Sequence, residues 1–299
     1  MQIEFSMKIG VYGIKFNPEK LSTFQNLFTY LKTKLDKNTI SIYSGLFKQL
    51  VGNVKDIDDF DTFSYSDEIK KYDLLICLGG DGSILDSLSI VRSSNVPVFG
   101  INTGRLGFLS SVSSEEIKKP LDKILSGNLK YDRRSILKLS TKSNHFGDIN
   151  YALNEVTVQK KDSSSMMTIH AYVDDEYLNS YWADGLIVST PTGSTGYNLS
   201  CSGPIIMPGS EVFIITPIAP HNLNVRPLII PDNKKITLKL EGRDDEFLVA
   251  LDARSEPIKI NEELTIEHGE FYMNVVRTPN HSFFSTIRNK LNWGLDSRN

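Results

Sequence analysis

A short apolar segment that runs into a glycine turn constrains this chain more than any other feature of its sequence. Residues 73–78 read Asp-Leu-Leu-Ile-Cys-Leu, a nearly continuous apolar run that is typical of a strand covered on both faces. Gly79, Gly80 and Gly82 follow, and glycine lets backbone N–H groups approach a ligand closely. Ser83 is expected to cap the helix behind the turn. The apolar positions of that helix are Ile84, Leu85, Leu88 and Val91.

The glycine turn is also a natural anion site, because free N–H groups and the helix dipole point at the same spot. Its one ionisable group is Asp81. A carboxylate repels a phosphate, so Asp81 is expected either to hold a metal ion or to accept a proton from a hydroxyl. The alternative is a tight turn with an exposed aspartate, since a Gly-Gly-Asp-Gly sequence alone is weak evidence. Because the glycines would set the geometry of the turn, Asp81→Asn is expected to keep the fold.

Length and composition narrow the class of protein. A chain of 299 residues suggests one large or two medium domains. The net charge of -3 gives no reason to expect a nucleic acid or an anionic membrane as partner. Cys77 and Cys201 do not make a disulfide framework and suit a reducing cytoplasm. No apolar stretch approaches the roughly 20 residues of a membrane span, and residues 1–6 lack a signal-peptide pattern and read as a dispensable extension. The sequence therefore predicts a cytoplasmic protein.

The first part of the chain alternates strands with helices. Strands are expected at residues 8–13, 39–43, 73–78 and 96–101, and helices from Pro18, from the glycine turn, and from residues 113–116 with Gly127 as a stop. This order indicates a parallel sheet with crossover helices. Residues 44–66 are polar and leave their structure open. Residues 102–109 follow a strand, so they are expected on the same ligand-binding edge of the sheet as the glycine turn.

From about Tyr131 the pattern changes to short β segments. They lie at residues 135–140, 151–159, 166–173, 177–182, 186–190, 212–216, 235–240, 246–251 and 271–276, with a hairpin turn at residues 174–176. Strands at this spacing predict an antiparallel, sandwich-like domain. We therefore expect an α/β domain at residues 1–130 and a β-rich domain at residues 131–276. Residues 277–299 return to a helical pattern that would allow them to pack back on the first domain.

Three segments of the β-rich part are too polar or too rich in glycine for plain strands. Asn154 and Glu155 set an amide and a carboxylate into a β run, either to read hydroxyls or an amide of a ligand or as an exposed sheet edge. Residues 183–200 place Asp184 at the head of a strand and a loop of hydroxyl residues and glycines at its tail. Such a loop suits phosphates, ribose or a base, although a solvated loop is the alternative. Residues 216–221 form a proline-framed loop, in which His221 is expected to be structural.

Several common sites are excluded. The five histidines are scattered and lack zinc-ligand spacing. The chain has neither Gly-x-x-x-x-Gly-Lys-Ser/Thr nor Gly-x-Gly-x-x-Gly. The sequence therefore does not predict a P-loop enzyme or a standard Rossmann dehydrogenase.

Taken together and in this order, the segments resemble the NAD kinase family. The resemblance rests on residues 78–82, 102–109, 154–155, 184–186, 191–197 and 216–221. The Gly-Gly-Asp-Gly turn is shared with diacylglycerol, sphingosine and phosphofructokinase-type kinases, whereas the later segments are more specific. The resemblance implies an α/β first domain, a β-rich second domain that binds the dinucleotide, and a homo-oligomer, either a dimer or a tetramer.

The resemblance also implies an activity, the transfer of the ATP γ-phosphoryl group to the 2′-hydroxyl of the adenosine ribose of NAD, which makes NADP. Mg²⁺ or another divalent metal would arrive with ATP, with no dedicated protein site. Asp81 would accept the proton. The residues implied for NAD are Asp81, Gly82, Asn154, Glu155, Asp184, Thr195, Gly196, Tyr197, Asn198, Ser200 and Ala219, and those for the ATP phosphates are Gly79, Gly80, Gly82 and Ser83. Two points stay open: whether the phosphoryl donor is ATP or polyphosphate, and whether the enzyme accepts NADH as well as NAD.

The chain departs from the family pattern at three places. Ser83 stands where the family often has threonine, and Trp182 where many members have a basic residue. A Gly-Gln pair often follows the late aspartate, where this chain has Asp252-Ala253-Arg254. Two alternatives remain, a lipid or sugar kinase that shares the glycine turn and a dinucleotide sensor without catalysis. The polar loop before Tyr197 disfavours an acyl channel, and the intact Asp81 disfavours a sensor.

Overall fold

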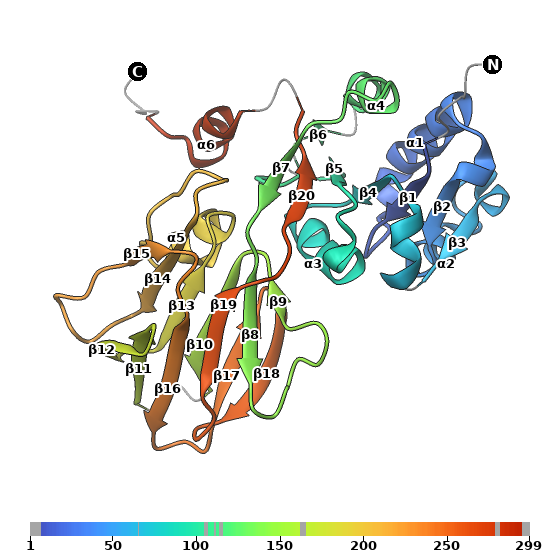
Figure 1. Cartoon of the computed structure of the whole chain (residues 1–299). Helices are drawn as coiled ribbons and strands as arrows, with labels where there is room; N and C mark the ends of the chain where they lie inside the picture. The colour runs from blue at the N-terminus through green and yellow to red at the C-terminus, as the bar shows by residue number, and fades with distance from the viewer. Residues whose placement is uncertain are drawn as a thin grey trace. The chain divides into compact units, whose positions relative to one another are not determined.

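The computed structural model describes residues 7–64, 66–104, 107–110, 112–113, 116–161, 166–278 and 282–294. The chain forms two compact units (Figure 1). The first unit comprises the described residues up to Arg133 together with those from Met273 onward, and the second spans Arg134–Tyr272. In the described part of the chain, no helix has both the length and the apolar character that crossing a bilayer requires.

The first unit is built on an eight-stranded sheet in the order β3-β2-β1-β4-β5-β20-β7, with β6 paired to β5. Its strands are β1 (Ile9–Tyr12), β2 (Ile40–Tyr43), β3 (Asp61–Phe63), β4 (Leu74–Leu78), β5 (Val98–Asn102), β6 (Val112–Ser113), β7 (Tyr131–Arg134) and β20 (Met273–Val276). The pairings that join β3, β2, β1, β4, β5 and β20 are parallel. The predicted parallel α/β architecture is therefore confirmed.

Helices cover both faces of this sheet. The helices of this unit are α1 (Leu21–Lys34), α2 (Ser44–Leu50), α3 (Asp81–Val91), α4 (Lys118–Leu125) and α6 (Phe283–Leu291), with 3-10 turns at Pro18–Lys20, Lys37–Thr39, Ile57–Asp59, Ser66–Lys71 and Arg92–Ser94. On one face, Phe24 and Leu27 of α1 share a core with Ile76 of β4. On the other face, Ile84 of α3 packs so closely on Gly100 of β5 that a Cβ there would lie 2.3 Å from Cδ1. Every residue of β4 is buried, as its apolar run predicts.

Three local predictions for the first unit are wrong. Helix α3 begins at Asp81 with Gly80 as its N-cap, so Ser83 is not the cap, because the Ser83 N–H already donates to Gly80 O in the first turn. Helix α4 begins at Lys118 without a side-chain cap, because Val112–Ser113 pair with β5 as a strand. Residues 114 and 115 of that predicted helix start lie outside the described residues. Strand β20, expected in the β-rich sheet, pairs with β5 because its apolar side chains are buried there.

The second unit consists of two six-stranded sheets, which confirms the predicted antiparallel sandwich-like fold. One sheet has the order β15-β14-β13-β10-β17-β18 and the other β12-β11-β16-β19-β8-β9. Their bounds are β8 (Leu137–Thr141), β9 (Tyr151–Ala152), β10 (Glu155–Lys160), β11 (Met167–Val173), β12 (Glu176–Trp182), β13 (Gly185–Ser189), β14 (Val212–Ile218), β15 (Leu228–Pro231), β16 (Ile236–Gly242), β17 (Glu246–Leu251), β18 (Arg254–Lys259) and β19 (Leu264–His268). Apolar side chains from both sheets, among them Val156, Ile169 and Leu238, fill one core.

Two turns show how sequence and structure compare in this unit. Asp174 and Asp175 have φ values of 49° and 66°, as a tight hairpin between β11 and β12 requires, so that predicted turn is confirmed. The predicted single strand at residues 151–159 is wrong, because the chain leaves β9 in one sheet and enters β10 in the other. The crossing residues are Leu153 and Asn154. Beyond them, the 3-10 turn Gly193–Thr195 and helix α5 (Tyr197–Ser200) form the hydroxyl-rich loop.

Candidate active site

Asp81 of the first unit ties the glycine turn to the loop that follows β5. Its Oδ2 accepts the N–H of Phe108 at 2.7 Å. Its Oδ1 accepts the N–H groups of Leu109 at 3.0 Å and Ser110 at 2.9 Å, and the Ser110 hydroxyl at 3.1 Å. The two glycine-bearing turns therefore meet on one edge of the sheet, as predicted. The carboxylate is not a merely exposed turn residue.

Close packing around this carboxylate requires a glycine. A Cβ on Gly107 would lie 1.7 Å from Asp81 Oδ1, well inside van der Waals contact. The Gly107 N–H donates to Ser110 O at 3.1 Å, which closes the turn. Asn102, at the end of β5, donates its Nδ2 to Ser110 Oγ at 2.7 Å and accepts the Gly104 N–H at 2.6 Å. The loop is therefore folded around the carboxylate.

The hydrogen bonds to Asp81 change the expected effect of Asp81→Asn. The sequence suggested that glycines alone set the geometry of the turn, and this premise is wrong. Both carboxylate oxygens accept backbone donors. An asparagine has one acceptor oxygen, and its amide nitrogen would face an N–H donor. The substitution therefore removes part of the anchor of the loop as well as the negative charge.

The glycine turn retains N–H groups for an anion. The Gly79 N–H donates to Ile101 O and the Ser83 N–H to Gly80 O, each at 3.0 Å. The N–H groups of Gly80, Asp81 and Gly82 open helix α3 and have no acceptor within the part of the chain that the structure describes. Three free donors at a helix N-terminus form an anion-binding arrangement.

In the second unit, the carboxylate of Asp252 holds the crossing between the two sheets. Its Oδ2 accepts the Leu153 N–H at 2.8 Å, and its Oδ1 accepts those of Asn154 at 2.8 Å and Glu155 at 3.1 Å. Asp252 itself has a φ of 53° and donates its own N–H to Glu155 O at 3.0 Å. Burial raises the pKa of the Asp252 carboxyl, and these N–H groups oppose that rise. The arrangement sets the direction of the Asn154 and Glu155 side chains.

The hydroxyl-rich loop packs closely against the crossing at Leu153 and Asn154. A Cβ on Gly193 would lie 2.2 Å from Asn154 O, so the approach of the two backbones requires glycine. Thr190 anchors the loop to the crossing, since its N–H donates to Asn154 O at 2.9 Å and its hydroxyl donates to Leu153 O at 2.6 Å. The predicted residues Asn154, Glu155, Thr195 and Gly196 are therefore brought together.

Asn154 and Glu155 carry buried polar atoms without partners. Asn154 Oδ1 and Glu155 Oε2 are buried and accept no hydrogen bond from any described residue. Burial raises the pKa of Glu155 to about 8, the negative charge of Asp252 adds to the rise, and a hydrogen bond from the Tyr197 N–H opposes it. A buried polar atom without a partner is costly, so these oxygens are poised to accept donors from a ligand.

Asp184 and Ala219 form a second group at the far end of the same strands. The Asp184 N–H donates to Ile218 O at 2.9 Å. The next residue in the chain is Ala219, which has a φ of 45°. Lys160 Nζ lies 2.6 Å from Asp184 Oδ1. Trp182 and His221 stack nearby with ring centroids 4.8 Å apart, and the His221 N–H donates to Trp182 O. An aromatic pair thus occupies the position of Trp182, where the resemblance leads us to expect a basic residue.

The register of β10 and β13 gives the separation of the two groups. Glu155 lies opposite Ser189, and Gln159 lies opposite Gly185. Asp184 lies one residue beyond Gly185, so five residues of extended chain, about 17 Å, separate it from the level of Glu155. Tyr197 lies along this span, because its N–H contacts Glu155 while its hydroxyl accepts Gln159 Nε2 at 3.1 Å.

Other predicted residues have more structural roles. Asn198 is fully buried, donates Nδ2 to Ser194 O and Pro204 O, and accepts the Thr216 hydroxyl, so its side chain holds the loop. Ser200 is exposed on α5. Arg254 is the last of the residues noted above as unusual in this sequence. It donates to Ile149 O and Tyr151 O and so stabilises the segment that leads into β9.

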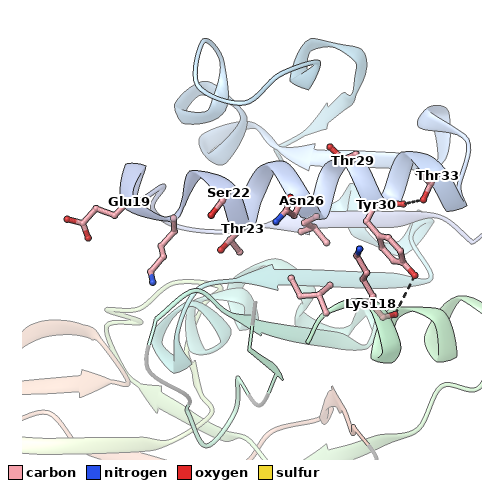
Figure 2. A pocket seen from close by; sticks show the side chains of 11 residues that line it. Glu19, Ser22, Thr23, Asn26, Thr29, Tyr30, Thr33 and Lys118 are labelled. Atoms are coloured by element: carbon pink, nitrogen blue, oxygen red, sulfur yellow. Dashed lines mark hydrogen bonds between the residues drawn. The ribbon is translucent and has the colours of Figure 1, made fainter. Parts of the chain in front are cut away.

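Ser110, Lys160 and Asp252 contact predicted site residues but were not themselves predicted. Lys160 has no distinctive spacing or neighbouring motif, whereas Ser110 directly follows the segment at residues 102–109, which is the signal that could have found it. Asp252 was noted only for the residues that follow it, and an aspartate directly after a strand was the signal that could have found it. A cavity of about 560 Å³ along α1 and the start of α4 holds none of the predicted residues (Figure 2). Its lining is largely the hydroxyl and amide side chains of α1, such as Ser22, Asn26 and Thr29.

Comparisons with known proteins identify the family of the chain. Residues 17–129 match the ATP-NAD kinase N-terminal domain, and residues 153–278 match the ATP-NAD kinase C-terminal domain. An NAD kinase of Cytophaga hutchinsonii is 45% identical over 294 residues, which are 98% of this chain and 100% of that protein.

Two solved structures share the fold. Yeast NADH kinase complexed with NADH has a TM-score of 0.86 at 22% identity, over 97% of this chain and 88% of the other. An NAD kinase from Archaeoglobus fulgidus in complex with ATP has a TM-score of 0.73 at 26% identity, over 96% of this chain and 99% of the other. The chain therefore belongs to the NAD kinase family and is an enzyme with NAD kinase activity.

Proposed function

We propose that the enzyme transfers the γ-phosphoryl group of ATP to the 2′-hydroxyl of the adenosine ribose of NAD, with Asp81 as the proton acceptor. The observation that carries the proposal is the N-terminus of α3, where a carboxylate lies beside three N–H groups that have no acceptor among the described residues. Phosphoryl transfer needs donors that hold phosphate and a group that takes the hydroxyl proton. Gly80 and Gly82 supply N–H donors for the phosphates, while Gly79 and Ser83 shape the turn.

A divalent metal belongs to this proposal as part of the substrate. Among the described residues, no group of three His, Cys, Asp or Glu side chains is arranged to hold a metal ion. Asp81 is the one carboxylate of the glycine turn, and its hydrogen bonds already occupy most of its oxygen lone pairs. Mg²⁺ usually keeps several waters and is bound largely through substrate phosphates, so a metal that arrives with ATP requires no dedicated protein site here. When bound, Mg²⁺ neutralises charge on the phosphates.

The second unit would hold the dinucleotide. Asn154 and Glu155 offer oxygens that have no partner among the described residues and could accept ribose hydroxyls, and Asp184 and Ala219 lie about 17 Å away along β10 and β13. Two polar groups at this separation suit the two halves of one extended ligand. Thr195, Gly196, Tyr197, Asn198 and Ser200 would line the path between them. The ATP and NADH bound to the two solved relatives support these ligand classes. A homo-oligomer, dimer or tetramer, and a cytoplasmic location complete the proposal.

A direct assay tests the reaction. The purified protein, incubated with NAD, ATP and Mg²⁺, is expected to form NADP, measured with an NADP-specific dehydrogenase. Parallel reactions with polyphosphate or NADH identify the donor and acceptor. Formation of phosphorylated diacylglycerol or sugar with no NADP would contradict the proposal.

Asp184→Ala is expected to weaken NAD binding about tenfold to a hundredfold while ATP binding changes little. A lost charged hydrogen bond costs about 1.5 to 3 kcal/mol. Titration calorimetry with each ligand measures both affinities. Glu246→Ala is the matched control, because Glu246 forms a comparable ion pair with Lys161 at 2.9 Å on the same sheet. Equal weakening of both ligands by Asp184→Ala would show that Asp184 does not serve the dinucleotide.

A further inference from the structure

A buried chain of hydrogen bonds leads from Asn102 through Ser110 to Asp81. Ser110 is fully buried and Asn102 is 2% exposed. Asn102 Nδ2 lies 2.7 Å from Ser110 Oγ, and Ser110 Oγ lies 3.1 Å from Asp81 Oδ1. An amide nitrogen only donates, so Ser110 Oγ accepts from Asn102 and its own proton is left for the carboxylate. The direction of the serine hydroxyl is therefore set.

This chain makes the two oxygens of Asp81 unequal. Oδ1 accepts three donors, the N–H groups of Leu109 and Ser110 and the Ser110 hydroxyl. Within the described part of the chain, Oδ2 accepts a single donor, the Phe108 N–H at 2.7 Å. A carboxylate oxygen has about two lone-pair sites. Oδ1 is therefore saturated, and Oδ2 keeps a site for one more proton donor.

We propose that Ser110, oriented by Asn102, is a positioning residue that directs the substrate proton to Oδ2 of Asp81. The inference rests on the proposed function, in which Asp81 is the base. In the step, the proton of the 2′-hydroxyl passes to Oδ2, and the electron pair of that oxygen forms the bond to the γ-phosphorus. The bond from the γ-phosphorus to the bridging oxygen breaks, and its electron pair leaves on ADP. Ser110 exchanges no proton, because it holds the plane of the carboxylate and occupies Oδ1.

The test compares three substitutions of Ser110 with a matched buried serine. Ser110→Ala is expected to lower kcat about tenfold or more with KM for NAD and ATP within about twofold, since a hydrogen bond to a charged group is lost. Ser110→Thr keeps the hydroxyl and should restore kcat to within about threefold. Ser110→Cys is expected to lie between them, because a thiol is a weak donor. Ser87→Ala is the control, because Ser87 is fully buried on α3 and donates only to Ile84 O at 2.7 Å.

Thermal unfolding of each variant separates positioning from stability. Ser87→Ala should also lower the Tm, by less than Ser110→Ala because one hydrogen bond is lost rather than two, and should leave kcat unchanged. The proposal is overturned if Ser110→Ala keeps kcat within about twofold of the parent enzyme. It is also overturned if a folded Ser110→Thr and a folded Ser110→Cys are both as slow as Ser110→Ala. Asp81→Asn, assayed beside them, separates a failure of the base role of Asp81 from a failure of the positioning role of Ser110. If Asp81→Asn turns over normally, the base role fails, whereas an inactive Asp81→Asn with a fully active Ser110→Ala removes Ser110 alone.

Discussion

Asp81→Asn is expected to lower turnover by about a hundredfold to ten-thousandfold, the usual contribution of a positioned general base. NAD should still bind, because the residues proposed to hold it lie mostly in the second unit. The structure adds a second effect. Four hydrogen bonds to this carboxylate hold the loop at residues 107–110, and the side-chain amide of asparagine can accept only some of them. A modest loss of thermal stability should therefore accompany the loss of turnover.

Turnover of Asp81→Asn across a Mg²⁺ series, beside NAD binding to the same variant, distinguishes the roles of Asp81. A base that has been removed cannot be replaced by metal, so turnover should stay low at every Mg²⁺ concentration. Recovery of most of the rate with excess Mg²⁺ would make Asp81 a metal ligand. Near-normal turnover would remove it from the chemistry altogether. The Ser110→Ala variant removes one of the four hydrogen bonds but keeps the carboxylate, so its kcat shows how much of the loss arises without removal of the charge.

Glu155→Gln is expected to remove a pH dependence from the stability of the ligand-free enzyme. Burial and the charge of Asp252 raise the pKa of Glu155 from 4.5 to about 8 in the folded state. Between those values the folded state holds a proton that the unfolded state has lost. Stability is therefore highest below about pH 4.5 as far as this group is concerned, and falls as pH rises to about 8. At about 1.4 kcal/mol for each unit of pKa, the full effect is on the order of 3 to 5 kcal/mol.

Urea unfolding of the two proteins at pH 5 and pH 8.5 measures this contribution. The parent enzyme should lose stability between the two values, and Glu155→Gln should lose much less, because glutamine has no proton to release. Glu246→Gln is the matched control. Glu246 is exposed, and its hydrogen bond with Lys161 lowers its pKa, so its replacement should leave the loss between pH 5 and pH 8.5 in place. An unchanged slope in Glu155→Gln would show that another group carries the pH dependence.

The sequence was sufficient where the signal was local. The apolar run of β4, the glycine turn and the first helical positions lie within a few residues of one another, so the parallel unit could be recognised directly. The alternating pattern after Tyr131 likewise predicted the antiparallel fold. Asp81, Asn154 and Glu155 could be predicted as site residues because side chains of unusual chemistry interrupt regular segments there.

The sequence was insufficient where long-range contacts decide the structure. The break between β9 and β10 depends on Asp252, which lies 99 residues from Leu153. Strand β20 has an apolar run that would fit either sheet, and only its pairing with Val98 of β5 settles the choice. The partners of Asp81 are mainly backbone N–H groups, which every residue except proline carries. The residue types at positions 108–110 therefore could not predict these hydrogen bonds.

The contact between Phe108 and Asp81 also has a consequence for the order of events in the catalytic cycle. Oδ2, the oxygen proposed to receive the proton, is the oxygen that the Phe108 N–H contacts at 2.7 Å. Before transfer this bond has a charged acceptor, and after transfer it has a neutral one. A charge-assisted bond is about twice as strong as a neutral one. Residues 107–110 are therefore held more tightly before proton transfer than after it, so the oxygen that receives the proton also sets how firmly this part of the chain is held.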